Sequence, residues 1–262
     1  MITVWSQGVA DDNMPEKMLV DTLEKVRRHP WWFARAKLAL ATLRRQGVLA
    51  PAKVMDVGCG WGVNLDMLET AGYAAYGLDI SRQILERIDR PNRHLIEADL
   101  NQPLPPQAEL SDGLLALDVL EHLDDDSGAT KRMAQLLRPG GVAVISVPAR
   151  PDLFSEFDRI QGHRRRYVPD RLRATFADTG LEVQEIFWWG AWMIPILRRM
   201  RQGAENPSKT YADYLRLPPW PIPSLMKLAY AWEHSRALEG KLQTGTSLFA
   251  VAKRAANATV KP

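Results

Sequence analysis

The stretch Val54-Met55-Asp56-Val57-Gly58-Cys59-Gly60-Trp61-Gly62 decides the fold of this chain. It begins as a short apolar run, which is typical of a buried strand, and breaks into three glycines at alternate positions. Glycine permits a sharp turn and lets a ligand lie against bare backbone, where a Cβ would block it. Helix-like sequence follows from Val63 to about Thr70. A strand, a glycine turn and a helix N-terminus together predict a nucleotide-sized pocket.

The spacing of the glycines distinguishes this turn from the dinucleotide-binding turn of NAD-dependent enzymes. It is G-x-G-x-G, whereas the dinucleotide fingerprint is G-x-G-x-x-G. The spacing therefore points away from NAD and toward a different adenosine-bearing ligand. A nicotinamide-dependent oxidoreductase on a similar sheet is further disfavoured because the sequence lacks a catalytic Tyr-Lys pattern.

The composition of the 262-residue chain bounds its class. The length fits one domain, or one domain with an insertion, and 46% hydrophobic residues are enough for an ordinary core. A single cysteine excludes an internal disulfide framework, and no Cys/His cluster has zinc-site spacing. Residues 1–12 lack the basic start and apolar core of a signal peptide, so we expect a cytoplasmic, reducing setting.

Charge and hydropathy limit the partners. The net charge of +3 is too small to indicate nucleic acid, and no base-extruding Asn/Asp-Pro-Pro-Tyr motif is present. The longest strongly apolar stretch, Ile186–Leu197, is too short to span a bilayer. We expect a small-molecule partner, no nucleic acid, and a monomer or homodimer.

Apolar strands alternate with helical segments from Val54 onward. The predicted strands are Lys53–Val57, Ala74–Asp79, Arg93–Ala98, Asp112–Leu117, Gly141–Val147, Leu181–Trp188 and Thr246–Lys253. The predicted helices between them are Val63–Thr70, Ser81–Ile88, Ser127–Leu137 and Pro169–Asp178. This alternation indicates an α/β fold with a mostly parallel sheet.

Two helical regions lie outside the alternation. Amphipathic segments at Glu16–His29 and Trp31–Gln46 precede the first strand, with Pro30 between them. Helical patches at Met193–Arg201 and Ile222–Ala237 precede the last strand. We predict four parts, because a structureless loop as long as 190–245 would be unusual. They are a helical cap at 1–49, a Rossmann-like domain at 50–189 plus 246–254, a helical insertion or substrate lid at 190–245, and a tail at 255–262.

Five short motifs follow one another at regular intervals. They are Asp56–Gly62, Gly77–Ser81, Glu97–Leu100, Asp118–Leu123 and Leu137–Gly141. In this order they resemble the class I S-adenosylmethionine-dependent methyltransferases, over roughly residues 50–253. The resemblance implies a Rossmann-like, doubly wound, seven-stranded and mostly parallel sheet whose last strand is antiparallel. It also implies S-adenosyl-L-methionine as cofactor and S-adenosyl-L-homocysteine as product.

Two acidic residues are expected to hold the adenosine. Asp79, followed by Ile80, ends the second strand, where its carboxylate can accept hydrogen bonds from both ribose hydroxyls. Its alternative role is a helix N-cap, for which Ser81 is better suited. Asp99 can accept a hydrogen bond from the adenine amino group while Leu100 packs on the ring. The alternative for Asp99 is a turn cap.

The glycine turn itself is expected to hold the methionine part. Gly58, Gly60 and Gly62 should pass under it. Asp56 should order the loop or reach the ammonium group indirectly. In related methyltransferases the region of Asp118 lines the methionine site through backbone atoms, and we expect the same here.

The triplet Asp118-x-x-Glu121-His122 carries more than one interpretation. His122 could act as a general base, because its pKa lies close to the working pH, or it could be purely structural. The triplet also resembles a Glu-x-x-Glu-His metal site of some quinone-pathway O-methyltransferases. The first carboxylate here is the shorter Asp118, and we expect no metal.

The segment Phe154–Tyr167 is unusually polar for a connection at a catalytic mouth. It resembles the Gly-His-x-Arg-Arg-Tyr signature of one methyltransferase subgroup. We expect His163 to be a base or substrate orienter, Arg166 to bind substrate, and Tyr167 to supply a catalytic hydroxyl. The alternative is a solvated charge run before a helix.

Aromatic residues mark both helical regions. Trp31–Arg35 resembles an aromatic-plus-Arg element of the same subgroup, so Trp32 and Arg35 are candidate substrate contacts that could close over the cofactor. The alternative is that these aromatics anchor a helix on the core. The insertion 190–245 holds eight basic and four acidic residues, and it is rich in tryptophan together with Trp188 and Trp189. We favour a lid over a peripheral membrane contact, and a lipid-linked substrate would satisfy both.

The expected activity is in-line methyl transfer by an S-adenosylmethionine-dependent methyltransferase. Two candidate histidines near the expected methyl group favour O-methylation of a small molecule or lipid-linked acceptor. The alternatives are an N-methyltransferase of a small molecule, and a non-catalytic S-adenosylmethionine-binding partner associated with a membrane.

Overall fold

A single mixed sheet forms the centre of the molecule. The computed structural model describes residues 2–8, 13–105, 108, 110–201, 211–217 and 219–256, without the side chains of 200 and 201. The strands are β1 (Ile2–Val4), β2 (Lys53–Val57), β3 (Ala74–Asp79), β4 (His94–Glu97), β5 (Ser111–Leu117), β6 (Leu137–Pro148), β7 (Leu181–Trp189) and β8 (Ser247–Arg254). Their order in space is β1-β4-β3-β2-β5-β6-β8-β7.

The strand directions confirm the expected fold class. Strands β1 to β6 pair in parallel with one another, and β8 runs antiparallel between β6 and β7. The expected number of seven strands was wrong, because β1 adds an eighth at the edge beside β4. Strand β1 has only three residues, of which Thr3 and Val4 are exposed, so it does not give the apolar run that marks the other strands.

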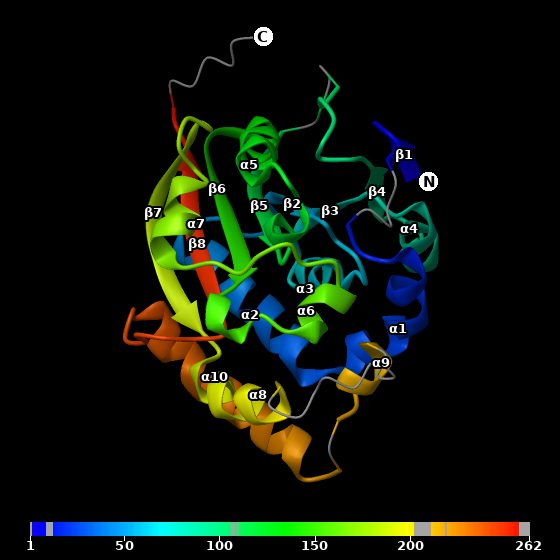
Figure 1. Cartoon of the computed structure of the whole chain (residues 1–262). Coiled ribbons are helices and arrows are strands. Elements are labelled where there is room, and N and C mark those ends of the chain that lie inside the picture. The colour runs from blue at the N-terminus through cyan, green and yellow to red at the C-terminus, as the bar shows by residue number, and fades with distance from the viewer. Residues whose placement is uncertain are drawn as a thin grey trace.

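Helices cover both faces of the sheet (Figure 1). The helices before β5 are α1 (Glu16–Arg28), α2 (Pro30–Arg45), α3 (Val63–Thr70) and α4 (Arg82–Ile88). Those after β5 are α5 (Asp126–Gln135), α6 (Glu156–Ile160), α7 (Pro169–Ala174), α8 (Ile194–Arg201), α9 (Tyr211–Tyr214) and α10 (Ile222–Leu238). The apolar core on one face includes α5 and α7, and on the other face it includes α2, α3, α4 and α10.

The sequence predicted most bounds closely and a few poorly. The bounds of β2, β3 and α3 are as expected, and Ser81 caps α4 through its side chain, as proposed for it. The helix expected at Pro169–Asp178 already ends at Ala174. Strand β6 begins at Leu137 instead of Gly141, because Leu137 pairs with Ser111 across a shift in register.

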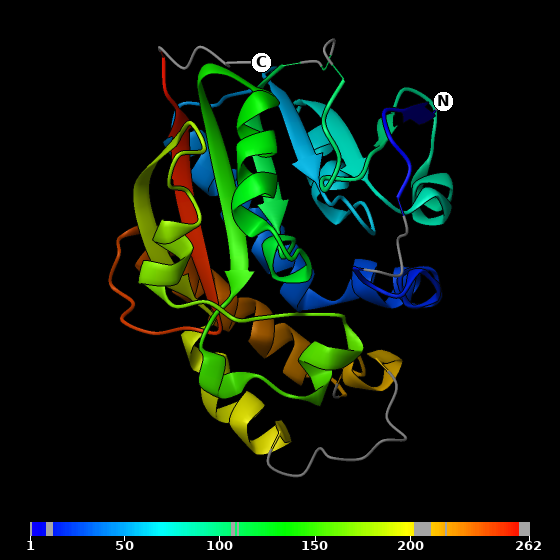
Figure 2. The ribbon, with the colours of Figure 1, turned by 45° about the horizontal axis from the view of Figure 1, so that its top comes forward.

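The carboxyl ends of the parallel strands meet the two helical regions. Figures 1 and 2 show α1 and α2 together with α8, α9 and α10 gathered at this end of the sheet. Short 3₁₀ turns leave the strands here, at Leu120–His122, Pro151–Leu153 and Ala191–Met193. This edge is where ligands bind in open α/β sheets.

None of the helices within the described ranges is both long and apolar enough to cross a bilayer. The cytoplasmic setting and the four-part division of the chain stay predictions. Part of the expected insertion, 202–210, and most of the expected tail, 257–262, lie outside the described residues.

Candidate active site

A cavity of about 480 Å³ lies at the carboxyl ends of the strands. Its volume falls in the range of sites that hold a small ligand. One part of its wall comes from the glycine turn and the ends of β3 and β4. The other comes from α2, the loop after α6, and α8 to α10. We call these the donor half and the acceptor half, after the methyl donor and the acceptor that the sequence predicts for them.

The donor half is built from backbone. Gly58, Gly60 and Gly62 all have positive φ, at +67°, +43° and +73°. A Cβ on Gly58 would lie 2.6 Å from a methyl carbon of Val119, so this close approach requires glycine. Gly58 and Gly60 line the cavity, whereas Gly62 is the N-cap of α3 and does not. The expectation that all three pass under the methionine part is therefore too broad.

Asp79 fixes the turn and faces the cavity. Its two carboxylate oxygens accept hydrogen bonds from the backbone N–H of Gly60, at 2.8 Å, and of Ser81, at 2.9 Å. Burial raises the pKa of Asp79, against the opposing effect of these amides. The carboxylate therefore joins the glycine turn to the end of β3, and Ile80 continues the wall.

Asp56 lies behind the turn and not in the cavity wall. One of its oxygens accepts a hydrogen bond from Asn64 Nδ2 at 2.9 Å, and the other has no partner among the described residues. Burial raises the pKa of this carboxyl to about 7. Asn64 lines the cavity. An indirect role for Asp56, through Asn64, fits this arrangement.

Asp99 is placed differently from its neighbour Leu100. Leu100 lines the cavity, but Asp99 accepts a hydrogen bond from the backbone N–H of Asn101 at 2.8 Å. This is the geometry of the turn-capping alternative. The backbone N–H of Asp99 donates to Ser6 Oγ at 2.9 Å, so the N-terminal segment runs beside this end of the site. The adenine contact of Asp99 stays a prediction.

Helix α1 lies against the donor half through polar contacts. The indole Nε1 of Trp61, within the glycine turn, donates to the carbonyl of Leu19 at 2.9 Å. Glu16 accepts from Ser81 Oγ and from Gln83 Nε2, both at 2.6 Å. These bonds join α1 to the turn and to α4.

Helix α2 contributes an ion pair at the centre of the cavity wall. Arg35 is buried and pairs with Asp118, and both line the cavity with Trp32. The guanidinium carbon of Arg35 also lies 4.7 Å from the centre of the Trp31 ring. Asp118 has a φ of +59°, which is uncommon for a residue other than glycine. Since the Asp118 side chain is engaged by Arg35, any role in cofactor binding would fall to its backbone.

The acceptor half contains a histidine held by a buried carboxylate. His163 Nδ1 lies 3.0 Å from Asp158 Oδ1, which also accepts hydrogen bonds from Arg166 Nε at 2.8 Å. The other oxygen, Asp158 Oδ2, accepts from the backbone N–H of Ser155 at 2.9 Å. A carboxylate at Nδ1 favours the tautomer with its proton on Nδ1, which leaves Nε2 as a proton acceptor. His163 and Arg166 both line the cavity.

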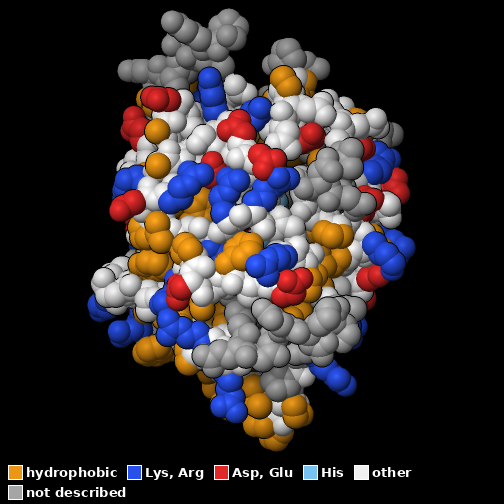
Figure 3. Space-filling model, in the orientation of Figure 1, with side chains coloured by type: hydrophobic (Ala, Val, Ile, Leu, Met, Phe, Trp, Pro, Cys, Tyr) orange, Lys and Arg blue, Asp and Glu red, His pale blue; other side chains and the backbone are white. Residues whose placement is uncertain are grey.

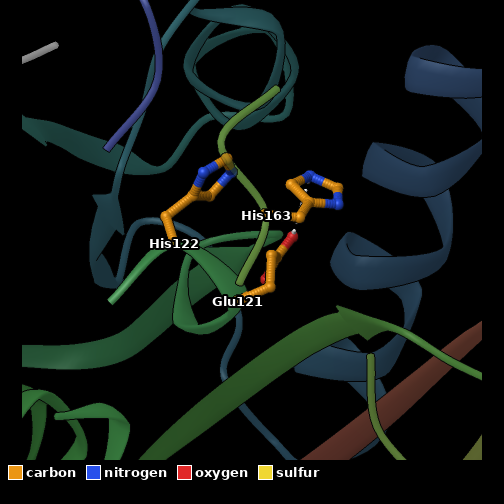
Figure 4. A group of neighbouring side chains, drawn as sticks. All are labelled: Glu121, His122 and His163. Atoms are coloured by element: carbon orange, nitrogen blue, oxygen red, sulfur yellow. Dashed lines mark ion pairs between the residues drawn. The ribbon is translucent and has the colours of Figure 1, made fainter. Parts of the chain in front are cut away.

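Glu121, His122 and His163 form a compact group (Figure 4). The carboxyl group of Glu121 points toward the His163 ring, with Oε1 3.9 Å from Nε2. Burial and the nearby Asp118 carboxylate raise the pKa of Glu121 well above its usual value. Burial lowers the pKa of His122 to about 3. One ligand atom from each of the three lies within 4.8 Å of the others, so the group could hold a metal ion.

This group differs from the expected Asp118-x-x-Glu121-His122 set. Asp118 pairs with Arg35 and is replaced in the group by His163, which comes from a loop far along the chain. The motif alone could not predict this, because it contains only local residues. A neutral His122 fits an accepting or structural role better than that of a charged group.

Tyr167 was assigned wrongly to the catalytic set. Its side chain is fully buried in the core on the α5 and α7 face, outside the cavity wall. Its hydroxyl donates to Asp126 Oδ2 at 2.9 Å, and burial raises its pKa. Backbone pairing with Ala149 turns Tyr167 toward the core, so a tyrosine next to a cavity-lining arginine need not face the cavity.

The insertion supplies aromatic residues that the sequence did not single out. Tyr211 and Tyr214 of α9 line the cavity and pack on Phe157, with ring centres 5.6 Å and 4.9 Å away. Glu233 of α10 is buried and accepts hydrogen bonds from the backbone N–H of Gly190 and Ala191. Thus α9 contributes to the cavity wall while α10 is attached to the end of β7.

A comparison with families of known proteins matches residues 29–186 to the family described as "Methyltransferase domain". The match covers more than half of the chain and spans the glycine turn, Asp79 and Asp118. The chain belongs to this family. It is an S-adenosylmethionine-dependent methyltransferase.

Curated relatives of this methyltransferase are distant. One is the "Ubiquinone biosynthesis O-methyltransferase" of Pseudomonas syringae pv. tomato, 23% identical over 60% of this chain and 80% of that protein. Another of the same name, from Aromatoleum aromaticum, is 28% identical over 45% of this chain and 57% of its own. A "Probable S-adenosylmethionine-dependent methyltransferase" of Mycolicibacterium smegmatis is 28% identical over 55% of this chain and 56% of that protein. The chain thus spans little more than half the length of these last two.

Solved structures agree on the fold. The "[4+2]-Cyclase SpnF" has a TM-score of 0.60 at 15% identity, with 97% of this chain and 99% of that one covered. A "putative sarcosine dimethylglycine methyltransferase" from Galdieria sulphuraria has a TM-score of 0.57 at 17% identity, covering 85% and 86%. At such identities the likeness shows the fold alone. One of these proteins of similar fold is named as a cyclase, not a methyltransferase.

The donor half of the methyltransferase fits its cosubstrate. The Gly58 backbone, the Asp79 carboxylate and the amide of Asn64 face the cavity, and Asp56 keeps one buried oxygen without a partner behind them. Such a set offers acceptors to hydroxyl and ammonium groups. Of the predicted site residues, four do not line the cavity, namely Asp56, Gly62, Asp99 and Tyr167.

Proposed function

We propose that this methyltransferase methylates an oxygen of an apolar small molecule and that His163 accepts the proton of the acceptor hydroxyl. The observation that carries the proposal is the buried Asp158 carboxylate on Nδ1 of a cavity-lining histidine. A base with an oriented ring is most useful for a hydroxyl, which must lose its proton during the reaction.

The residues of the donor half would bind and orient the cosubstrate. Asp79 is the candidate for the ribose hydroxyls and the Gly58–Gly60 backbone for the methionine part. When bound, S-adenosylmethionine supplies an activated methyl group, so alignment of the reacting groups at about 3 Å accounts for much of the acceleration. Arg35, paired with Asp118, would keep this region of the wall fixed.

In the acceptor half, the proton would move to His163 Nε2. The negative charge of Asp158 would then stabilise the imidazolium, as a buried aspartate does in the Ser-His-Asp arrangement. Arg166 holds Asp158 in place through two nitrogen atoms, at 2.8 and 2.7 Å. Arg166 would therefore act as a positioning residue as well as a candidate substrate contact.

The wall of the acceptor half favours an apolar acceptor. Its side chains from the insertion are mostly apolar or aromatic, namely Trp192, Met193, Ile196, Leu197, Tyr211, Tyr214, Leu215, Leu217, Ile222 and Met226. Two of the three relatives above are named for ubiquinone biosynthesis, and the ring of ubiquinone carries an isoprenoid chain. We therefore propose a hydroxylated ring with an apolar substituent, and a lipid-linked acceptor is the extreme form of this class. The insertion would act as its lid.

Methyl transfer from labelled S-adenosylmethionine to alkyl-substituted catechols tests the proposal. In His163→Ala we expect kcat to fall by about 10²–10⁴-fold, with unchanged cosubstrate affinity in calorimetry. Asp158→Asn should lower kcat less, because the histidine is retained but no longer oriented. His94→Ala is the matched control, since His94 is exposed and stacks on Tyr76 away from the cavity.

Each other outcome excludes a part of the proposal. Retained turnover in His163→Ala would rule out an essential base at this position. Transfer to amines but not to hydroxyls would identify an N-methyltransferase. Cosubstrate binding without transfer to any acceptor would indicate a non-catalytic partner.

A further inference from the structure

Helix α10 turns a row of large apolar side chains to solvent. Leu225, Leu228 and Trp232 are 57%, 67% and 61% exposed. They are spaced three and four residues apart, which places them on one side of the helix. Trp220, just before the helix, is 83% exposed. We call these four residues the α10 outer face.

An apolar face of this kind is unusual on a protein that meets only water. Tryptophan is enriched where an apolar phase meets water, because its ring is apolar and its N–H is polar. Figure 3 shows orange apolar side chains together with blue basic ones at the lower end of the molecule, over α8 and α10. The outer face thus combines exposed apolar side chains with tryptophan, as membrane-interface surfaces do, while the inner side of α10 is apolar because it packs on the protein.

The charges beside the outer face are basic. Helix α10 exposes Lys227, and the Arg236 guanidinium carbon lies 4.9 Å from the centre of the Trp232 ring. Helix α8, which lies beside α10 in Figures 1 and 2, exposes Arg199 and also Arg198, which pairs with Asp152 at 3.3 Å. The single acidic residue within the bounds of these two helices, Glu233, is buried and bonded to backbone amides. The surface is therefore complementary to an anionic one.

The same two helices also form part of the cavity wall. Ile222 and Met226 of α10, with Ile196 and Leu197 of α8, line the acceptor half. Met226 directly follows Leu225 of the outer face. Only the thickness of these helices therefore separates the acceptor half from the outer face.

We infer that the α10 outer face docks on the surface of a bilayer that contains anionic lipids. The apolar side chains enter the boundary between headgroups and acyl chains, and the basic residues of α8 and α10 pair with lipid phosphates. Docking brings the acceptor half next to the lipid phase, which is a direct route for an apolar acceptor. The docking surface itself depends on neither the identity of the acceptor nor the proposed base.

Cosedimentation of the full chain with vesicles tests the inference without any turnover. We expect binding to vesicles of phosphatidylcholine with phosphatidylglycerol, weaker binding to phosphatidylcholine alone, and a blue shift of tryptophan emission on binding. The double variant Leu228→Ala/Trp232→Ala should lower the partition coefficient by about tenfold or more, because both side chains lose apolar area in the interface. Neither residue lines the cavity, so cosubstrate affinity in calorimetry should stay unchanged and report correct folding.

The matched control is Leu49→Ala. Leu49 is 59% exposed but precedes β2, at the opposite end of the sheet from the cavity. This variant should bind vesicles as the unmodified chain does. Arg199→Gln and Lys227→Gln should each weaken binding about fivefold on anionic vesicles only, and added salt should do the same.

Two results would overturn the inference. One is the absence of vesicle binding, or binding that is the same in the double variant and in the unmodified chain. The other is concentration-dependent dimerisation that the double variant abolishes without vesicle binding, which would assign the outer face to a second copy of the chain. Loss of vesicle binding by the double variant, with methyl transfer to a water-soluble acceptor intact, would support docking even if the acceptor class were wrong.

Discussion

The donor and acceptor halves of the cavity are built in different ways. The donor half consists of strand ends, positive-φ glycines and one carboxylate that binds two backbone amides. The acceptor half consists of side chains from α2, from the loop after α6 and from α8 to α10, held together by buried ion pairs and stacked aromatic rings. A site built from backbone atoms suits the cosubstrate, because S-adenosylmethionine is the same in every reaction of the family. A wall of side chains can be altered residue by residue when the acceptor changes.

The largest effect is expected from Asp79→Ala in the donor half. The change leaves the amides of Gly60 and Ser81 without their acceptor and removes the candidate ribose contact. A hydrogen bond to a charged group contributes about 1.5–3 kcal/mol, and Asp79 is expected to accept two from the ribose, so cosubstrate affinity should fall at least about 100-fold in calorimetry. Asp158→Asn, in the acceptor half, is the control and should keep its affinity. Unchanged affinity in Asp79→Ala would sink the assignment.

A smaller effect is expected where only the backbone of the donor half is disturbed. In Gly58→Ala the new Cβ meets Val119 at 2.6 Å and the residue must keep a φ of +67°. We expect about tenfold weaker cosubstrate binding and a lower melting temperature. Gly140→Ala is the control, because φ is +76° there and a Cβ meets nothing within 4 Å. It should cost about 1 kcal/mol of stability without changing affinity.

If Gly58→Ala and Gly140→Ala bound the cosubstrate with equal affinity, the close approach of Gly58 to Val119 would not matter for cosubstrate binding. The double variant Gly58→Ala/Val119→Ala separates the two causes further. It removes the methyl group that the new Cβ would meet, so part of the lost affinity should return.

His122, in the cavity wall beside His163, allows a test through pH. Its pKa is lowered to about 3 when folded, against about 6.5 unfolded, so the unfolded state binds more protons between these values. Its contribution to stability is therefore complete above the unfolded pKa and is lost as the pH falls toward 3. Between pH 7 and 5 the loss should be about 2 kcal/mol.

Comparing His122→Asn with the unmodified chain isolates the contribution of His122 to the pH dependence of stability. Urea unfolding at pH 7 and pH 5 should show a smaller loss of stability in the variant. An equal loss in both proteins would mean that His122 is not held in its neutral form.

The smallest effect is expected from metal removal. We expect methyl transfer to be unchanged by chelation, because Asp118, the first carboxylate of the related motif, is paired with Arg35. Turnover that is lost with chelator and restored by a divalent ion would instead assign Glu121, His122 and His163 as ligands. Metal content measured on the purified chain provides an independent readout.

The donor half could largely be predicted from the sequence because its determinants are local. Glycines that need positive φ, a carboxylate at a strand end and a serine cap lie within a few residues of the elements they define. The bounds of β2, β3 and α3 were therefore correct. Gly62 caps α3 and does not line the cavity, because a local motif does not say which way each residue faces, whereas the adenine contact of Asp99 stays a prediction.

The acceptor half could not be predicted in the same way. Asp158 has the sequence position of an ordinary capping residue of α6. Its contacts with His163 and Arg166 are seen only in the folded structure. Tyr211 reaches the cavity from the insertion, through packing on Phe157. Such contacts depend on tertiary structure, and no spacing in the sequence encodes them.

The antiparallel direction of β8 determines where the insertion can grow. Trp189, the last residue of β7, is in register with Ser247, the first residue of β8. The chain therefore leaves the sheet after Trp189 and rejoins it at Ser247, which lines the cavity. Closing a longer loop between fixed ends costs little extra free energy, so this segment can be lengthened or exchanged while the sheet keeps its register. If the insertion forms the acceptor site as proposed, new acceptors can be accommodated by changes in this segment alone, without changes to the strand ends that would hold the methyl donor.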